Sequence, residues 1–180
     1  FSTHHTDVAL LYLITSVAFL FLGGALALAM RAELFLPGPQ IISDSMTFNR
    51  LFTVHGTTMI FLFILPFASA IGNYLIPIMV RYKDMAYPKL NAIAYWMIPV
   101  GSALIWLGFS DTTWNAYPPY SIIRAPGPAA DMWIFGLKIV GVSSILGAVN
   151  FIVTILKCKH PDLPLSKMPL LAWSILTSSL

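Results

Sequence analysis

Charged residues are scarce in this chain. Aspartate, glutamate, lysine and arginine make up 9% of its 180 residues, whereas soluble domains carry about 25%. Hydrophobic residues make up 58%, and the mean hydropathy is +0.80. This composition excludes a water-soluble globule, and it excludes a disordered chain, which needs low hydrophobicity and high net charge. It is typical of an all-α, polytopic membrane protein.

Cysteine is nearly absent as well. Cys158 is the single cysteine of the sequence, so the chain can form neither an intrachain disulfide nor a metal site that needs two cysteines. The formal net charge is +3, but the cations are scattered through short loops and form no basic stripe, which excludes a nucleic-acid partner. No basic flank precedes the apolar residues that begin at Val8, and this argues against a signal peptide.

Four charge-poor runs are long enough to cross about 30 Å of hydrocarbon, which takes roughly 20 helical residues. They cover residues 8–30, 51–80, 90–110 and 132–156, and a fifth run starts near 168 and continues to 180. We therefore predict one membrane domain over the whole chain, a helical bundle of four full transmembrane helices and the start of a fifth. The second run is the longest, and we expect Pro66 to kink it.

Lysine and arginine are distributed unevenly between the two ends of the predicted bundle. Six cations share the end that holds the N-terminus and the loops 81–89 and 157–167: Arg81, Lys83, Lys89, Lys157, Lys159 and Lys167. Three lie at the other end: Arg31, Arg50 and Arg124. Because inner-side loops carry the excess of lysine and arginine, this distribution predicts that the N-terminus lies inside, in the cytoplasm or matrix.

His55 is the only histidine within a predicted span, because the others fall in the inner-side tail and loops: His4, His5 and His160. It follows Arg50 closely, which places it roughly 7–8 Å below the outer edge of the membrane. An imidazole there needs a polar partner, a ligand or a metal, and neutral imidazole is the usual protein ligand of haem iron. A histidine that is hydrogen-bonded between two helices fits the spacing equally well.

A row of polar residues leads from the inner side into the predicted bundle. It begins at Asp84, in the loop 81–89, and continues with uncharged side chains of the spans: Asn73, Asn91, Ser143, Ser144 and Asn150. Such side chains can hold ordered water inside a membrane. A carboxylate at the entrance of a row of ordered water molecules is what a proton-uptake path needs. The alternatives are a loop acid paired with Lys83 or Lys89, and hydrogen bonds between helices, which we favour for the two serines taken alone. The whole set together favours a water path.

Two cations near the ends of the predicted spans, Arg31 and Lys138, can be explained by structural roles. Arg31 closes the first span at the outer side, where an arginine commonly snorkels to the interface, although it would also reach the polar edge of a haem bound near His55. Lys138 lies six residues into the fourth span. Because that span starts at the outer side, the ammonium can snorkel outward, and we predict a structural role for Lys138.

Seven strings, in order along the chain, resemble subunit I of the haem–copper respiratory oxidases. They are RAELFLPGPQ at 31–40, FNRLFTVHGTTMIF at 48–61, IGNYLIPIMV at 71–80, KDMAYPKLN at 83–91, WNAYPPY at 114–120, GVSSILGAVNFIVTI at 141–155 and PLLAW at 169–173. The resemblance covers nearly the whole chain. It implies the N-terminal portion of an A-type catalytic subunit of the twelve-helix type.

The resemblance implies a role for each matching position. His55 takes the place of an axial ligand to the low-spin haem iron, Arg31 that of the arginine beside this haem, and Trp114 that of the tryptophan near its propionates. Glu33 falls where some members bind a structural cation. Asp84 takes the place of the carboxylate at the mouth of the D proton channel, and the other polar residues match groups further along it: Asn73, Asn91, Ser143, Ser144 and Asn150.

The family also implies what lies outside this sequence. A second axial histidine, the high-spin haem and the copper of the oxygen site belong to the complete subunit and are not bound by these residues. We expect the partners to be the remainder of subunit I, subunit II and other oxidase subunits in a lipid bilayer, with cytochrome c, a copper protein or quinol as electron donor. The chain starts at Phe1 and stops inside an apolar run at Leu180, so we expect a fragment that is inactive alone.

Some positions depart from the family pattern. Phe48 and Lys138 stand where mitochondrial members carry a tyrosine and a histidine. Leu22 and Leu26 replace an arginine and an aspartate of one quinol-oxidising subgroup, which argues against that particular quinol site. The loop sequences indicate a prokaryotic cell membrane rather than the mitochondrial inner membrane.

Two functions from other classes stay open on the sequence alone. One is a haem-free, proton-coupled transporter in which His55 and Asp84 form a proton relay. The other is a structural membrane subunit in which His55 packs against a neighbouring helix. Neither of them would give a haem spectrum.

Overall fold

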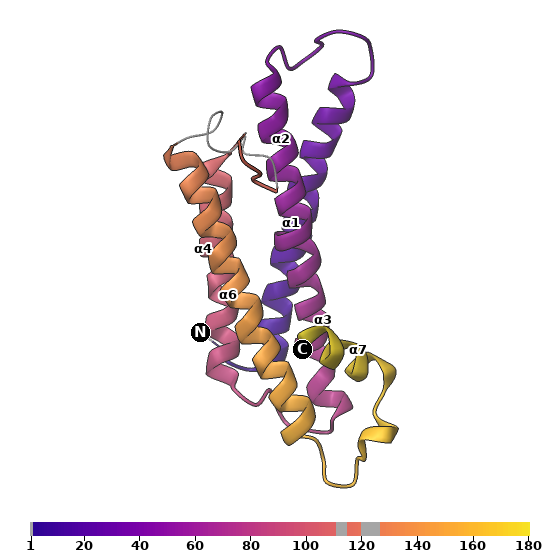
Figure 1. The fold of residues 1–180 in the computed structure, drawn as a ribbon. Helices are drawn as coiled ribbons and strands as arrows, with labels where there is room; N and C mark the ends of the chain where they lie inside the picture. The colour runs from indigo at the N-terminus through magenta and orange to yellow at the C-terminus, as the bar shows by residue number, and fades with distance from the viewer. Residues whose placement is uncertain (1, 111–114, 120–126) are drawn as a thin grey trace.

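The computed structural model describes residues 2–110, 115–119 and 127–180, which form a bundle of long helices (Figure 1). The elements are α1 (His5–Glu33), α2 (Ser45–Thr57), the π-helix η1 (Thr58–Ile64), α3 (Leu65–Met79), α4 (Pro88–Gly108), α6 (Pro128–Lys157), the 3₁₀-helix η2 (Leu165–Lys167) and α7 (Leu170–Ser179). Four helical rods are long and apolar enough to cross a membrane: α1, the continuous α2–η1–α3, α4 and α6. The prediction of an all-α membrane bundle is therefore confirmed.

Capping residues, rather than hydrophobicity, set where the first two rods begin. The ring of His4 accepts the backbone N–H of Thr6, so α1 starts before the apolar run does. The carboxylate of Asp44 accepts the N–H groups of Met46 and Thr47 at 3.1 Å each, and α2 starts directly after it. These hydrogen bonds, that from Met46 first, also lower the pKa of the Asp44 carboxyl below its usual range.

The second rod changes its hydrogen-bonding pattern halfway along. It is π-helical in η1 and returns to α-helix in α3, whose first turn contains Pro66. Pro66 has no N–H to donate to the carbonyl of Leu62, one turn earlier, so the regular α-helical pattern cannot continue through this turn. The disturbance that the sequence predicts at Pro66 thus takes the form of a π-helical segment, and this segment separates His55 from Asn73.

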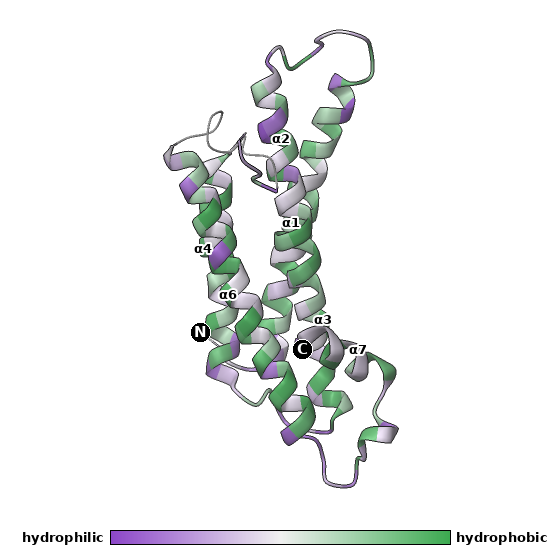
Figure 2. Ribbon diagram, in the orientation of Figure 1, coloured by the Kyte–Doolittle hydropathy of each residue, from purple (hydrophilic) through white to green (hydrophobic). Residues whose placement is uncertain are grey.

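The rods pack as two pairs, α1 along α2–η1–α3 and α4 along α6, which lie side by side (Figure 1). Glycines let α4 and α6 approach closely. A Cβ atom on Gly101 would lie 2.9 Å from the Gly136 carbonyl oxygen, and one on Gly136 would lie 2.6 Å from the Gly101 carbonyl oxygen. Close packing at small residues is the usual way in which helices associate inside a membrane. Figure 2 shows apolar residues along the rods and hydrophilic residues mainly toward the ends and in the loops.

Three segments that are far apart in sequence meet at one end of the bundle. The backbone N–H of His160, in the loop after α6, donates to the carbonyl of Val80 at 2.9 Å. The backbone N–H of His5, at the start of α1, donates to the carboxylate of Asp84 at 3.1 Å. The N-terminus and the two loops therefore share one end, as the alternation of the predicted spans requires. Helix α7 packs at the same end, against α6 and α3.

Candidate functional site

His55 points from the last turns of α2 toward α1, and its Nδ1 lies 2.9 Å from the carbonyl oxygen of Gly23. A carbonyl oxygen can only accept, so Nδ1 carries the ring proton and Nε2 keeps its lone pair. Metal-ligating histidines commonly donate one ring N–H to a backbone carbonyl in this way, which fixes the ring and frees the other nitrogen. Within the described part of the chain no group hydrogen-bonds to Nε2. His55 therefore fits the role of an axial ligand to haem iron.

Helix α1 comes close to the second rod at the same level. A Cβ atom added to Gly23 would lie 2.7 Å from Sδ of Met59 and 3.2 Å from Cγ2 of Thr58, both in η1. The neighbouring Gly24 faces open space, with no atom within 4 Å of an added Cβ. The absence of a side chain at Gly23 is thus what brings its carbonyl within hydrogen-bonding distance of His55.

Gly23→Val is expected to destabilise the protein, because the new side chain would need the space that Met59 and Thr58 occupy. Overpacking of this kind costs about 1–3 kcal/mol. Gly24→Val is the matched control, and it should change the free energy of unfolding by less than about 0.5 kcal/mol. Thermal unfolding of the purified complex measures both variants. Equal losses in the two would contradict the packing role of Gly23.

Two further residues were predicted to lie near a haem. Arg31 is exposed in the last turn of α1, and the turns between Gly23 and Arg31 correspond to about 12 Å along the helix. Arg31 and His55 therefore share one end of the bundle, with Arg31 further toward that end. Trp114 lies outside the described residues.

Glu33, which the resemblance places near a structural cation, binds backbone groups in this structure. Its side chain is 7% exposed, and its carboxylate accepts three N–H groups from the loop after α1, at distances of 3.1, 2.7 and 2.7 Å: Gln40, Ile41 and Ile42. Among the described residues, no group of three histidine, cysteine or acidic side chains is placed to hold a metal ion. Glu33 therefore orders the loop that leads into α2.

Asp84 lies half-buried in the loop between α3 and α4. Its Oδ1 accepts the backbone N–H groups of His5 at 3.1 Å and Met85 at 2.7 Å. In the described ranges Asp84 forms no ion pair, so the alternative reading as a partner of Lys83 or Lys89 does not apply to this structure. The carboxylate is held by main-chain donors at the end of the bundle that carries the N-terminus.

His5 is a residue of this site that the sequence did not reveal. We expected it in the inner-side tail, and the structure corrects this: His5 begins α1, is 6% exposed, and its Nδ1 donates to the Asn73 carbonyl oxygen at 2.9 Å. It is buried because α3 and the Asp84 loop fold over the first turn of α1. No local pattern separates it from the adjacent His4, which is exposed.

Asn73 and Asn91 are both buried, at 2% exposure. The Asn73 amide donates from Nδ2 to the Ser69 carbonyl at 2.9 Å, but its Oδ1 has no partner in the described part of the chain, and neither has Nδ2 of Asn91. Buried polar atoms without a partner are rare, and ordered water commonly satisfies them. These two side chains are therefore suited to hold water.

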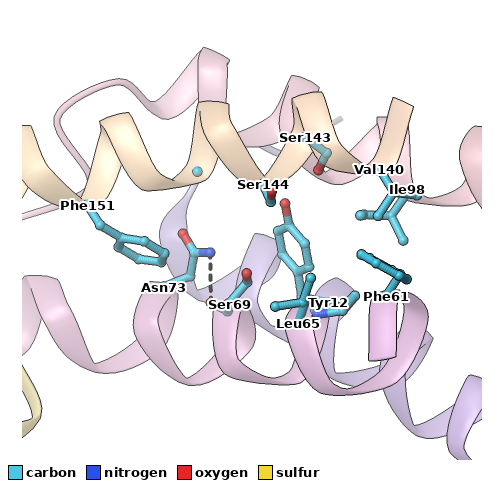
Figure 3. A pocket seen from close by; sticks show the side chains of 12 residues that line it. Tyr12, Phe61, Leu65, Ser69, Asn73, Ile98, Val140, Ser143, Ser144 and Phe151 are labelled. Atoms are coloured by element: carbon cyan, nitrogen blue, oxygen red, sulfur yellow. Dashed lines mark hydrogen bonds between the residues drawn. The ribbon is translucent and has the colours of Figure 1, made fainter. Parts of the chain in front are cut away.

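A small cavity of about 10 Å³ lies between the helix pairs, close to the volume of roughly 10–15 Å³ that one water molecule needs. Figure 3 shows the polar side chains around it, which come from α1, α3 and α6: Tyr12, Ser69, Asn73, Ser143 and Ser144. The structure thus brings three of the predicted proton-path residues to one cavity. It adds the Tyr12 phenol, which a sequence reading takes for part of an apolar helix.

Ser143 and Asn150, two of the predicted path residues on α6, bind backbone groups of α4 and of the loop before it. The Ser143 hydroxyl donates to the Ala94 carbonyl at 2.6 Å. Asn150 holds the loop before α4, because its Oδ1 accepts the N–H of Tyr87 at 2.9 Å and its Nδ2 donates to the carbonyl of the same residue at 3.3 Å. Thr154, one turn later, accepts the N–H of Ala86 at 3.0 Å. Helix α6 therefore fixes the loop that carries Asp84.

Asn150→Ala is expected to loosen this loop, since it leaves the partly buried N–H of Tyr87 without its partner, while the Tyr87 carbonyl keeps the N–H of Asn91. The expected loss of stability is about 1–3 kcal/mol, and the amides of residues 84–90 should exchange faster with solvent. Ser144→Ala is the control, because that hydroxyl donates to Gly141 of its own helix. Hydrogen exchange of the complex measures the loop in both variants. Unchanged protection of the loop in Asn150→Ala would contradict the role of Asn150 in holding Tyr87.

Comparisons with known proteins identify the family of this chain. The family model described as "Cytochrome C and Quinol oxidase polypeptide I" matches residues 7–180. Cytochrome c oxidase subunit 1 of Synechocystis sp. is 45% identical over 183 residues, covering 99% of this chain and 33% of that protein. A probable cytochrome c oxidase subunit 1-alpha of Streptomyces avermitilis is 43% identical, covering 97% and 31%, and cytochrome c oxidase subunit 1 of Thermostichus vulcanus is 42% identical, covering 100% and 33%.

The chain spans about a third of the length of the curated relatives that it matches. The match nevertheless extends over nearly every residue of this chain, including the strings around His55 and Asp84. The chain therefore belongs to the cytochrome c and quinol oxidase polypeptide I family.

Proposed function

We propose that this chain is part of the catalytic subunit of a terminal respiratory oxidase, in which it supplies one axial ligand of a low-spin haem and the inner part of a proton path. The observation that carries the proposal is that only one ring nitrogen of His55 is hydrogen-bonded within the described residues. Its Nδ1 is committed to the Gly23 carbonyl, and its Nε2 keeps a free lone pair. Family membership supports the same role, because haem and copper are expected in this family.

When bound, a low-spin haem supplies one-electron redox chemistry. The contribution of this chain is ligation and orientation. The Gly23 carbonyl holds the plane of the His55 ring and makes Nε2 a stronger donor to a metal. Arg31, at the same end of the bundle, would place a positive charge near the polar edge of the haem.

Proton uptake would begin at Asp84. Both of its hydrogen bonds from main-chain donors fall on Oδ1, and no group of the described residues binds Oδ2, which would exchange protons with water at the inner surface. The unpartnered amide atoms of Asn73 and Asn91 would hold the first waters of the path. The cavity lined by Tyr12 and the α6 serines would hold the next water molecule of the path.

The sequence and the family also support a membrane orientation and a set of partners. The excess of lysine and arginine at the end that carries Asp84 supports an inner location of the N-terminus. The relatives named above are cytochrome c oxidase subunits of prokaryotes, which supports a prokaryotic cell membrane and cytochrome c as electron donor. The remainder of subunit I would supply the second haem ligand and the oxygen site, and subunit II would be a further partner.

A reduced-minus-oxidised visible spectrum of the purified complex that contains this chain, recorded with and without carbon monoxide, tests the proposal. We expect a low-spin haem band together with a separate haem that binds carbon monoxide. An intact complex without any haem signal would refute the proposal and leave His55 as a packing or relay residue.

A further inference from the structure

Lys138 places a positive charge inside a membrane-spanning helix, on the face that points away from the bundle. Its neighbours on this face of α6 are exposed and apolar: Phe135, Val142, Ile145 and Val149. The opposite face, with Val140 and Ser143, is buried in the core. An ammonium group at hydrocarbon depth requires a counter-charge, and Lys138 forms no ion pair with any of the described residues.

The Lys138 side chain extends toward the end of α6 that lies nearer to the membrane surface. Its Nζ lies 5.9 Å from the centre of the Phe135 ring, one turn closer to the N-terminus of the helix. The residues from Pro128 to Lys138 correspond to about 15 Å of helix, so a snorkelling ammonium reaches toward the lipid headgroups of this leaflet. The group that balances its charge is therefore expected near the hydrocarbon edge and not at the centre of the membrane.

Asp131 adds a charge of opposite sign to the same face of α6. Asp131 and Lys138 are nearly two helical turns apart, so their side chains share a face with an axial separation of about 10 Å. Both are exposed, and within the described ranges Asp131 forms no ion pair either. The face therefore presents a cation at the deeper position and an anion closer to the water. A zwitterionic phospholipid in that leaflet has the complementary order, with its phosphate deeper than its ammonium group.

We propose that this face of α6 binds one aminophospholipid of the phosphatidylethanolamine class. Its phosphate contacts Nζ of Lys138, and its ammonium group contacts the carboxylate of Asp131. An acyl chain lies along the apolar residues of the next two turns, Val142 and Ile145. Ethanolamine is favoured over choline because its ammonium group carries N–H donors that can hydrogen-bond to a carboxylate. The site lies apart from His55 and Asp84, so it goes beyond the proposed function and does not depend on it.

The test uses the complete membrane complex that contains this chain, transferred into nanodiscs of equal parts phosphatidylethanolamine and phosphatidylcholine. Lipids that survive detergent washing are then counted by mass spectrometry. We expect Lys138→Leu to retain one phosphatidylethanolamine per complex fewer than the unsubstituted complex. Asp131→Asn should still retain a phospholipid there but lose the preference for ethanolamine over choline. Lys157→Leu, at an exposed lysine in the last turn of α6, is the matched control and should leave the count unchanged.

Two outcomes would overturn the proposal. One is an equal count of retained phosphatidylethanolamine with and without the Lys138→Leu change. The other is a cryo-microscopy map in which Lys138 contacts the carboxylate of a neighbouring transmembrane helix and not a lipid headgroup. The haem spectrum should be the same in all variants, because none of them changes a residue near His55, so a failure of this site is distinguishable from a failure of the proposed function.

Discussion

His55→Ala in the complete oxidase is expected to abolish the low-spin haem band and, with it, turnover. The substitution removes Nε2, the only free nitrogen of a ring whose Nδ1 is already bound to the Gly23 carbonyl. His55 would hold the haem iron through Nε2, and its loss would remove the strong-field ligand that a low-spin state needs. Visible spectra of the reduced and oxidised complex measure the effect. His160→Ala, at a histidine in the loop after α6, is the control and should keep the full spectrum.

A second variant separates ligation from packing, because alanine also removes the hydrogen bond to Gly23. His55→Gln retains an amide N–H that can donate to this carbonyl, but it has no imidazole nitrogen for iron. We expect it to lose the low-spin band while the complex keeps more of its thermal stability than His55→Ala. A low-spin band that persists in both variants would assign the ligand to another residue and leave His55 as a structural histidine.

Asp84→Asn is expected to slow proton uptake on the order of 10²-fold, the usual contribution of one positioned proton-transfer group, while the haem spectrum stays intact. Asparagine keeps an oxygen that can accept the N–H groups of His5 and Met85, so the loop should keep its shape. Only the ability to take up and release a proton is lost. Proton uptake during turnover, measured with the complex in sealed vesicles, reports the change.

The control for Asp84→Asn is Asp162→Asn. Asp162 is 83% exposed in the loop after α6, at the same end of the bundle, and its loss should leave uptake unchanged. If the Asp84→Asn complex also pumped protons and turned over at the normal rate, Asp84 would only be an acidic residue of the loop. Protons would then have to enter at another residue. If both variants slowed uptake equally, the effect would come from the loss of negative charge at this end of the bundle and not from a specific donor.

Much of the fold could be predicted from local patterns. Charge-poor runs of membrane-spanning length predicted the four rods, because a backbone in lipid must satisfy its own polar groups and a helix does so within one segment. The alternation of the spans predicted that the N-terminus and the Asp84 loop share one end, and the hydrogen bond between His5 and Asp84 agrees. Helix starts were less predictable, since a cap such as Asp44 acts through a hydrogen bond and not through hydrophobicity.

The rotation of the second rod could not be predicted in this way. His55 and Asn73 are separated by about five α-helical turns, so a regular helix would place them on one face. The π-helix η1 lies between them and takes more residues per turn, which rotates α3 relative to α2. His55 consequently meets Gly23 of α1, while Asn73 lines the cavity opposite α6. A kink at Pro66 was foreseeable, but its consequence for these two side chains was not.

Composition and spacing were thus enough to identify the class of protein and the number of rods, because each follows from what one segment needs in lipid. They could not identify which ring nitrogen of His55 is free, that Asn73 keeps an unpartnered oxygen, or that Asn150 clamps Tyr87. Each of these properties depends on a contact between residues that lie on different helices or loops. Such contacts arise only when the rods pack, and no periodicity within one rod contains them.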